Sequence, residues 1–198
     1  MEDKKKEKLF MRDFFRKAGK AIYDYELIEP GDRILVGVSG GKDSLALLEV
    51  LALRARDPKQ NYTVVAAHIA VENVAYEVDG EYVRQFCEQL GVEFIHRTIA
   101  IAVKEDSGKP VCFVCSWNRR NAKEYGCNKL ALGHHRDDAI ESLLMSMMFN
   151  GTIASMPPKL AMFDRTFTLI RPFIYLTDEE TTRYAAYRNF KKQKKNCP

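Results

Sequence analysis

Apolar stretches that fit strands alternate with stretches that fit helices along most of this 198-residue chain, and no other feature limits the fold as strongly. The expected strands span residues 33–39, 62–70, 92–100, 128–134 and 166–173. They recur at intervals of roughly 30 residues, the size of a βαβ unit. Their nearly continuous apolar character is typical of parallel strands that are buried on both faces. The pattern predicts an α/β fold with a mostly parallel, five-stranded sheet and helices on both faces.

Helices are expected between these strands and near both ends of the chain. They span residues 6–25, 44–56, 75–91, 115–125, 137–151 and 177–188. The first is amphipathic, because its apolar residues recur at three- and four-residue steps. Gly91 fits a C-cap of the third helix, and either Thr177 or Asp178 fits the N-cap of the last.

Composition and charge argue against a membrane-spanning or secreted protein. No run approaches the roughly 20 apolar residues that cross a bilayer, and the charged start does not fit a signal peptide. We therefore expect a cytoplasmic protein with no membrane partner. The net charge of +4 is mildly basic, with lysine-rich runs near both ends. Such runs are usually solvated termini, but they also attract polyanions such as RNA.

Three polar segments each follow or close an expected strand. "SGGKDS" follows the first strand, "HIAVEN" closes the second, and "GHHRDD" follows the fourth. Ligands of parallel α/β sheets bind beyond the carboxyl ends of the strands. The three segments are therefore predicted to meet at one edge of the sheet and to form the functional site there.

The segment "SGGKDS" (residues 39–44) has the features of a phosphate-binding loop. Its two glycines allow a sharp turn and a close approach of the backbone to a ligand. The helix that follows offers unpaired N–H groups and the positive end of its dipole. Lys42 adds a positive charge, whereas Asp43 would repel a polyphosphate unless a divalent cation lay between them, so we assign Asp43 to magnesium. The string fits neither the Walker nor the dinucleotide motif, and the alternative is a glycine-rich turn with incidental polar residues.

"SGGKDS" is similar to the signature of the PP-loop ATP pyrophosphatases, which have the Rossmann-like adenine nucleotide α-hydrolase fold. Such enzymes cleave ATP between its α and β phosphates and adenylate a carbonyl-type oxygen, which a nucleophile then displaces. The resemblance implies a set of residues that hold the phosphates and magnesium: Ser39, Gly40, Gly41, Lys42, Asp43 and Ser44. It also places the adenine beside the end of the second strand, at Ala67, His68 and Ile69.

The segment "GHHRDD" (residues 133–138) concentrates two histidines and two aspartates at the start of a helix. A capping aspartate or a hydrogen-bonded structural histidine would explain such a string without any catalytic role. It resembles, however, the "GHHxDD" segment that lines the ATP site of PP-loop enzymes that modify tRNA, and a histidine there could also transfer a proton. The resemblance assigns Gly133 to nucleotide binding and four residues to catalysis: Lys42, Asp43, His135 and Asp138.

Cys112 and Cys115 form a C-x-x-C pair among five cysteines. In a reducing compartment this pair can share a metal or an iron–sulfur cluster or cycle as a dithiol. The alternative is a pair of buried cysteines that act as small apolar residues. A four-cysteine zinc site is disfavoured because the chain has no second closely spaced pair. Cys87 and Cys127 fit structural positions.

A longer resemblance, from about residue 10 to residue 180, includes "CSWNRRN" and "MPPKL…LIRPFIYLTDEE". These stretches closely resemble the tRNA 2-thiocytidine synthetase (TtcA-like) group of PP-loop enzymes. In that group the C-x-x-C pair and one later cysteine hold a 4Fe–4S cluster, which implies Cys112, Cys115 and Cys197 as ligands here. The family usually continues past this region, whereas this chain ends one residue after Cys197.

The resemblance implies an ATP-dependent tRNA sulfurtransferase. Such an enzyme adenylates the C2 oxygen of an anticodon-loop cytidine (position 32 in the family) and replaces it with sulfur. The implied partners are tRNA and a sulfur donor such as a cysteine desulfurase, and a homodimer is compatible with the sequence. Two alternatives remain: another PP-loop enzyme of the lysidine or thiouridine type, or a non-catalytic nucleotide-binding iron–sulfur protein.

The same resemblance divides the chain into three segments. Residues 1–28 are an N-terminal helical extension, residues 29–190 are the PP-loop ATP pyrophosphatase domain, and residues 191–198 are a basic tail that resembles a truncated end. The "MPPKL" stretch and Arg171 also match the family and are expected near the site.

Overall fold

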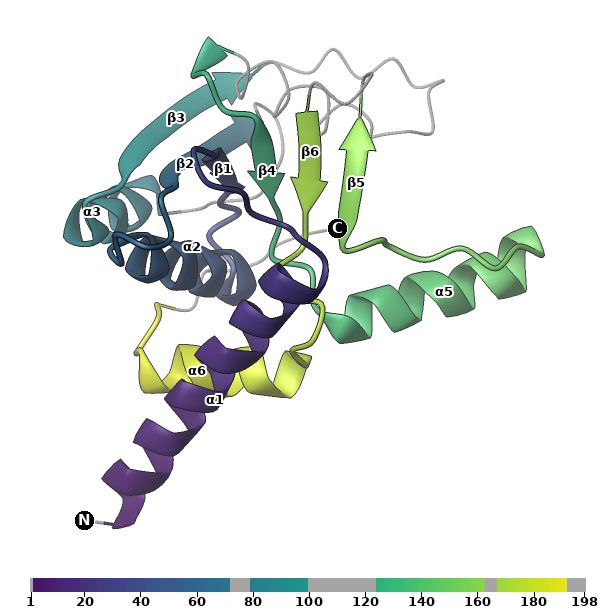
Figure 1. Cartoon of the computed structure of the whole chain (residues 1–198), viewed down its shortest axis with the longest axis horizontal. Helices are drawn as coiled ribbons and strands as arrows, with labels where there is room; N and C mark the ends of the chain where they lie inside the picture. Colours follow the sequence, from purple (N-terminus) through teal and green to yellow (C-terminus); the bar gives the residue numbers. More distant parts are fainter. Residues whose placement is uncertain (1, 72–78, 100–123, 163–166, 192–198) are drawn as a thin grey trace.

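The structure is a computed structural model that describes residues 2–71, 79–99, 124–162 and 167–191. These residues form a single six-stranded sheet in the order β3-β2-β1-β4-β6-β5. The strands are β1 (Arg33–Gly37), β2 (Thr63–Val71), β3 (Glu93–Ile99), β4 (Lys129–Ala131), β5 (Lys159–Met162) and β6 (Phe167–Ile170). All neighbouring strands are parallel except β5 and β6, which are antiparallel (Figure 1). The α/β class and the mostly parallel sheet are confirmed.

The count of five strands was wrong, because β5 had not been expected. This strand has four residues, and two of them, Leu160 and Ala161, are exposed. Its sequence overlaps an apolar run of only four residues, Leu160 to Phe163, which follows two prolines and a lysine, and a run this short does not identify a strand by itself. It pairs with β6 in register from Lys159 opposite Ile170 to Met162 opposite Phe167.

Side chains alternate between the two faces of the sheet, as the pleat of a strand requires. On β1, Ile34 and Val36 belong to one core cluster and Leu35 belongs to another. The first cluster also contains buried side chains from four helices: α1 (Glu2–Asp24), α2 (Lys42–Ala55), α3 (Gly80–Leu90) and α6 (Asp178–Tyr187). No described helix contributes a buried side chain to the second cluster. Helical cover is therefore confirmed for the first face, and the helix expected over 115–125 lies almost entirely outside the described residues.

Helix α1 is joined to the core by aromatic packing. Phe14 is buried and stacks on Tyr184 of α6, with ring centroids 4.3 Å apart. Phe14 also meets the ring of Phe173 edge-on at 5.4 Å. Tyr184 in turn donates a hydrogen bond of 2.9 Å to the buried carboxylate of Glu49 on α2. These contacts hold α6 between α1 and α2, and they fix the position of its N-terminus beside the start of α2.

Helix α5 (Arg136–Asn150) differs from the other helices of the described residues because none of its side chains is buried. It begins beside the carboxyl ends of β4 and β6 and extends away from the sheet (Figure 1). Its C-cap, Gly151, has φ +61°, a left-handed conformation that glycine adopts without a steric penalty. Among the helices of the described residues, none is long and apolar enough to cross a membrane.

Candidate nucleotide site

The loop between β1 and α2 is a tight turn that ends in an open helix N-terminus. Gly40 has φ +76°, which favours glycine, and Gly41 is the N-cap of α2 without a side-chain cap. Ser44 is buried, and its hydroxyl donates to the carbonyl of Gly41 at 2.8 Å and accepts from the backbone N–H of Ser39 at 3.2 Å. Ser44 therefore holds the turn closed, and the positive end of the α2 dipole remains available to an anion.

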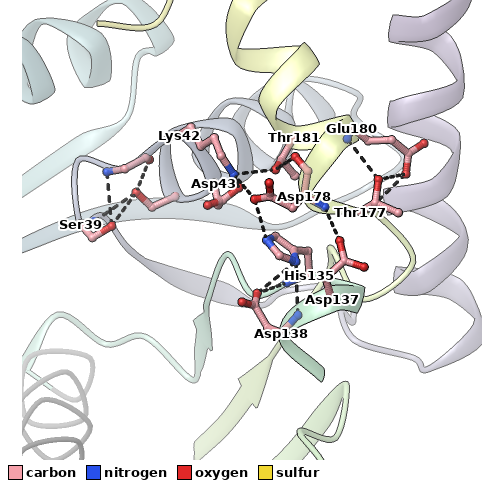
Figure 2. Close-up of polar contacts among 12 residues, drawn as sticks. Ser39, Lys42, Asp43, His135, Asp137, Asp138, Thr177, Asp178, Glu180 and Thr181 are labelled. Carbon is pink, nitrogen blue, oxygen red and sulfur yellow. Dashed lines mark hydrogen bonds and ion pairs between the residues drawn. The ribbon is translucent and has the colours of Figure 1, made fainter. Parts of the chain in front are cut away.

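Lys42 is the first residue of α2 and lies beside the N-terminus of α6. Its ammonium nitrogen is 2.7 Å from Asp43, 2.6 Å from Asp178 and 3.1 Å from the hydroxyl of Thr181 (Figure 2). Partial burial lowers the pKa of Lys42, but the hydrogen bonds and charge interactions with the carboxylates of Asp178 and Asp43 outweigh burial, and the pKa is raised overall. The ammonium is thus firmly charged at neutral pH.

The second motif begins α5 with a reciprocal capping arrangement. The carboxylate of Asp138 accepts the backbone N–H of His135 at 2.7 Å, and Nδ1 of His135 accepts the backbone N–H of Asp138 at 3.4 Å. This is a capping box with histidine at the N-cap position. The geometry accounts for the place of Asp138 as a helix cap, and a catalytic role for it stays a prediction.

The other ring nitrogen of His135 faces the phosphate loop. Nε2 is 3.4 Å from the same carboxylate oxygen of Asp178 that contacts Lys42. Because Nδ1 accepts a backbone hydrogen bond, the proton of a neutral ring is on Nε2 and points at Asp178. His135 and Lys42 therefore meet at one carboxylate, and the expectation that "SGGKDS" and "GHHRDD" share one edge is confirmed in the structure.

Gly133 joins the two motifs through its lack of a side chain. A Cβ at this position would lie 2.9 Å from the carbonyl carbon of Asp43, 3.0 Å from its oxygen and 3.1 Å from the nitrogen of Ser44. These are backbone atoms, which cannot rotate away as a flexible side chain can. Gly133 thus lets β4 approach the first turn of α2, and this packing is consistent with its predicted place at the nucleotide site.

The end of β2 supports the phosphate loop from the opposite side. The carbonyl of Ala67 accepts the backbone N–H of Val38 at 2.8 Å, and Nδ1 of His68 bonds the carbonyl of Val38 at 2.7 Å. Both side chains are buried, so any contact of Ala67 or His68 with adenine would use their backbone atoms. The assignment of Ala67, His68 and Ile69 to the adenine stays a prediction.

Two residues of the site were not predicted from the sequence. Asp178 and Thr181 lie on the first turn of α6, 136 and 139 residues beyond Lys42, yet both contact its ammonium. The sequence signal at Thr177 to Glu180 is that of a helix start, and Thr177 does form a capping box with Glu180. Asp178 looked like one more acidic residue of a first helical turn, and only the packing of α6 brings it to Lys42.

The histidine before His135, His134, is partly buried and lies near the guanidinium of Arg171. Nδ1 of His134 is buried and has no hydrogen-bond partner among the described residues. Burial lowers the pKa of His134, and the nearby guanidinium of Arg171 lowers it further. Arg171 is buried and donates to the carbonyl of Pro157 at 2.5 Å, so the "MPPKL" stretch and Arg171 contact each other close to the second motif, as expected.

These buried histidines predict a loss of stability in acid. The pKa of His68 lies below the ordinary value of 6.5, chiefly because of burial, so the unfolded chain binds more protons than the folded chain below that pH. The contribution of neutral His68 to the free energy of unfolding is fully present above pH 6.5, and it is lost as the pH falls from 6.5 through the lower pKa of the folded state. We expect the free energy of unfolding to fall below pH 6.5, and His68→Asn, which keeps a donor near Val38 but cannot titrate, to flatten this acid limb. Urea titrations at several pH values measure the free energy of unfolding. If its fall below pH 6.5 were the same in the variant, His68 would not be a cause of that fall.

The predicted cluster ligands Cys112, Cys115 and Cys197 lie outside the described residues. Cys87 and Cys127, expected to be structural, are both buried as free thiols. Burial raises the pKa of the Cys87 thiol to about 12 and also raises that of Cys127. Both thiols are therefore protonated and unreactive at neutral pH.

The carboxylates beside Lys42 suit a hard divalent cation. Side-chain ligand atoms of Asp43, His135 and Asp178 all lie within 4.8 Å of one another. Carboxylate oxygens are the ligands that Mg²⁺ prefers, usually one or two together with phosphate oxygens. In this structure the ammonium of Lys42 bridges the carboxylates of Asp43 and Asp178, so the space between them already holds a positive charge.

Comparison with known proteins agrees with this geometry. A sequence model described as the PP-loop domain matches residues 11–194. Proteins named tRNA-cytidine(32) 2-sulfurtransferase are 37% identical in Tolumonas auensis, 39% in Verminephrobacter eiseniae and 38% in Dechloromonas aromatica. Each match covers 88% of this chain but 60%, 58% and 63% of the relative, respectively, so the chain spans about three fifths of their length.

Solved structures support the fold. The U34-tRNA thiolase NcsA from Methanococcus maripaludis, solved with its 4Fe–4S cluster, superposes with a TM-score of 0.75 at 24% identity, over 96% of this chain and 68% of that one. A phosphoadenylyl-sulfate reductase from Candida auris superposes with a TM-score of 0.52 at 11% identity, over 89% of this chain and 81% of that one. With its family match over most of its length, and a phosphate loop placed between β1 and α2, the chain belongs to the PP-loop domain family.

Proposed function

We propose that the protein is an ATP-dependent tRNA sulfurtransferase that replaces the C2 oxygen of an anticodon-loop cytidine with sulfur. The observation that carries this proposal is the meeting of "SGGKDS" and "GHHRDD" around the ammonium of Lys42, at the carboxyl edge of a PP-loop sheet. The names of the relatives that share 37% to 39% of their aligned residues with this chain support the choice of tRNA and cytidine.

The first step of the proposed reaction uses the phosphate loop. The triphosphate of ATP would lie over Gly40, Gly41 and the N-terminus of α2, where N–H groups and the helix dipole favour negative charge. The C2 oxygen of cytidine would attack the α-phosphate, forming an O-adenylate and releasing pyrophosphate. Lys42 would stabilise the negative charge that develops on the leaving pyrophosphate. A magnesium ion at Asp43 would supply further positive charge between the phosphates and that carboxylate.

The second step replaces the activated oxygen. A sulfide equivalent would attack C2, and the bond from C2 to the adenylated oxygen would break, so AMP leaves with that oxygen. The proposed products are 2-thiocytidine in tRNA, AMP and pyrophosphate. The residues proposed to hold the iron–sulfur cluster, Cys112, Cys115 and Cys197, lie outside the described residues, so no step is assigned to them. These cysteines would hold a 4Fe–4S cluster. A cysteine desulfurase as sulfur donor, together with a thiol reductant that converts its persulfide sulfur to sulfide, completes the proposal.

Pyrophosphate release tests the proposed function. Purified protein kept under anaerobic conditions, ATP and tRNA from cells that lack the gene should together release pyrophosphate, and omission of tRNA should abolish most of the release. With a sulfide source, nucleoside mass spectrometry of that tRNA should then show new 2-thiocytidine. A new thiouridine or lysidine instead would move the protein to another PP-loop activity, and ATP binding without tRNA-dependent release would overturn the enzymatic proposal.

A further inference from the structure

The carboxylate of Asp178 contacts residues of both sequence motifs although it belongs to neither. One oxygen, Oδ1, accepts from Lys42 at 2.6 Å and lies 3.4 Å from Nε2 of His135 (Figure 2). The backbone N–H of Asp178 donates to the carboxylate of Asp137 at 2.6 Å. Asp178 is therefore tied to the phosphate loop by its side chain and to the start of α5 by its backbone.

In this arrangement all three N–H groups of the Lys42 ammonium are used in hydrogen bonds within the protein. An ammonium has three N–H groups, and Lys42 has three acceptors: Asp43, Asp178 and Thr181. The hydroxyl of Thr181 donates its own proton to the backbone carbonyl of Asp178 at 3.0 Å, so toward Lys42 it acts as an acceptor. A phosphate oxygen can bond Lys42 only if one of these three acceptors gives up its hydrogen bond.

Asp178 is the acceptor that can be released with the least disturbance. Thr181 is fully buried, and Asp43 lies on the same first turn of α2 as Lys42. The side chain of Asp178 is 59% exposed, so water can replace Lys42 around the carboxylate. The hydrogen bond to Lys42 lowers the pKa of Asp178, which keeps the group anionic in its present position.

We propose that Asp178 is a positioning residue that acts through Lys42: it holds the ammonium when no nucleotide is bound and releases it to the phosphates. The proposal rests on the proposed use of ATP at this site. Release of Lys42 leaves two carboxylates, Asp43 and Asp178, facing a polyphosphate, and this like-charge arrangement is unfavourable. Asp43 and Asp178 would then hold a divalent cation, which would supply the positive charge that the ammonium provided. Nucleotide and cation therefore bind as a coupled pair.

The test measures the affinity for a non-hydrolysable ATP analogue by calorimetry, in EDTA and in Mg²⁺. In EDTA, Asp178→Asn should bind the analogue about 3- to 5-fold more tightly than the natural protein, because the phosphates no longer compete with a partly exposed ion pair. In Mg²⁺ this gain should disappear. The dissociation constant in EDTA divided by that in Mg²⁺ should therefore be smaller for Asp178→Asn than for the natural protein. A merely structural role for Asp178 would weaken binding in both conditions.

Three further variants make the test specific. Glu179→Gln removes an exposed charge from the next position of the same helix turn and should change neither affinity. Thr181→Val, which removes the third acceptor of Lys42 with little change of volume, should tighten binding in EDTA to a smaller extent. In a Lys42→Met background, Asp178→Asn should lose more than half of its effect, because only direct repulsion of the phosphates then remains.

Each outcome decides between the proposals. Unchanged or weaker binding by Asp178→Asn in EDTA, or the same tightening with and without Lys42, would overturn the role of Asp178 and leave the proposed nucleotide site intact. Natural protein that does not bind the analogue in either condition would overturn both. If Asp178→Asn does not fold although Glu179→Gln does, the affinity of Thr181→Val in EDTA becomes the test. Tighter binding of the analogue by this variant supports competition for the ammonium of Lys42, and unchanged or weaker binding contradicts it.

Discussion

Lys42→Ala is expected to lower the rate of tRNA-dependent pyrophosphate release by about 10²- to 10³-fold, the usual effect of removing one preorganised group that stabilises developing charge. The ammonium is charged at neutral pH, is partly buried, and is held beside the N-terminus of α2 by Asp43 and Asp178. The substitution also leaves those two carboxylates without their cation, and they would repel the phosphates. Initial rates of pyrophosphate release at saturating ATP measure the effect.

A matched control separates this effect from a general change of charge. Lys59 is an exposed lysine in the turn that follows the far end of α2. Lys59→Ala changes the net charge by the same amount and should keep pyrophosphate release within about twofold, since exposed charges far from a site are largely screened. A Lys42→Ala protein that folds and still releases pyrophosphate at more than about a third of the natural rate would rule out the proposed phosphate loop.

The part of the fold that could be predicted is the part that follows from local chemistry. The sequence from Val36 to Leu48 combines a buried strand, the adjacent glycines Gly40 and Gly41, and an apolar helix, and each of these has a strong local preference. The helix ends at Gly91 and Gly151 were predicted because glycine takes the left-handed conformation that a C-cap needs. The meeting of "SGGKDS" and "GHHRDD" was predictable from the rule that ligands lie beyond the carboxyl ends of parallel strands.

The part that could not be predicted depends on contacts between distant elements. Strand β5 is defined by its hydrogen bonds to β6, because its apolar run of four residues is too short to indicate a strand by itself. Asp178 reaches Lys42 because Phe14, Tyr184 and Glu49 fix α6 between α1 and α2. Local sequence could show that a helix starts at Thr177, but it could not show which lysine its first carboxylate would meet.

The second motif shows how one residue can satisfy two interpretations. Sequence reasoning offered either a capping aspartate or a catalytic one, and Asp138 does take part in the cap, as the N3 residue of the capping box. Unexpectedly, the N-cap is His135, and its role in the cap places the proton of a neutral ring on Nε2. Capping and function are therefore linked at this position, because the cap directs Nε2 of His135 toward Asp178.

Gly133→Ala is the second variant with a large expected effect, because it forces apart two motifs that must touch. The added methyl group would lie 2.9 to 3.1 Å from backbone atoms of Asp43 and Ser44. Since neither the end of β4 nor the first turn of α2 can rotate away, overpacking should lower the free energy of unfolding by about 1–3 kcal/mol. The same displacement moves the N–H groups of α2, so nucleotide affinity should fall by at least about tenfold in protein that is still folded.

Gly80→Ala is the matched control for this variant. Gly80 is the first residue of α3, and a Cβ there would have no contact closer than 3.9 Å, to Cε1 of His96. Thermal unfolding and binding of a non-hydrolysable ATP analogue should be measured for both variants, and Gly80→Ala should resemble the natural protein in both. If Gly133→Ala lost stability but bound the analogue normally, the contact would be ordinary packing. Only a loss of affinity beyond the loss of folded protein supports a Gly133 that places the phosphate loop against the second motif.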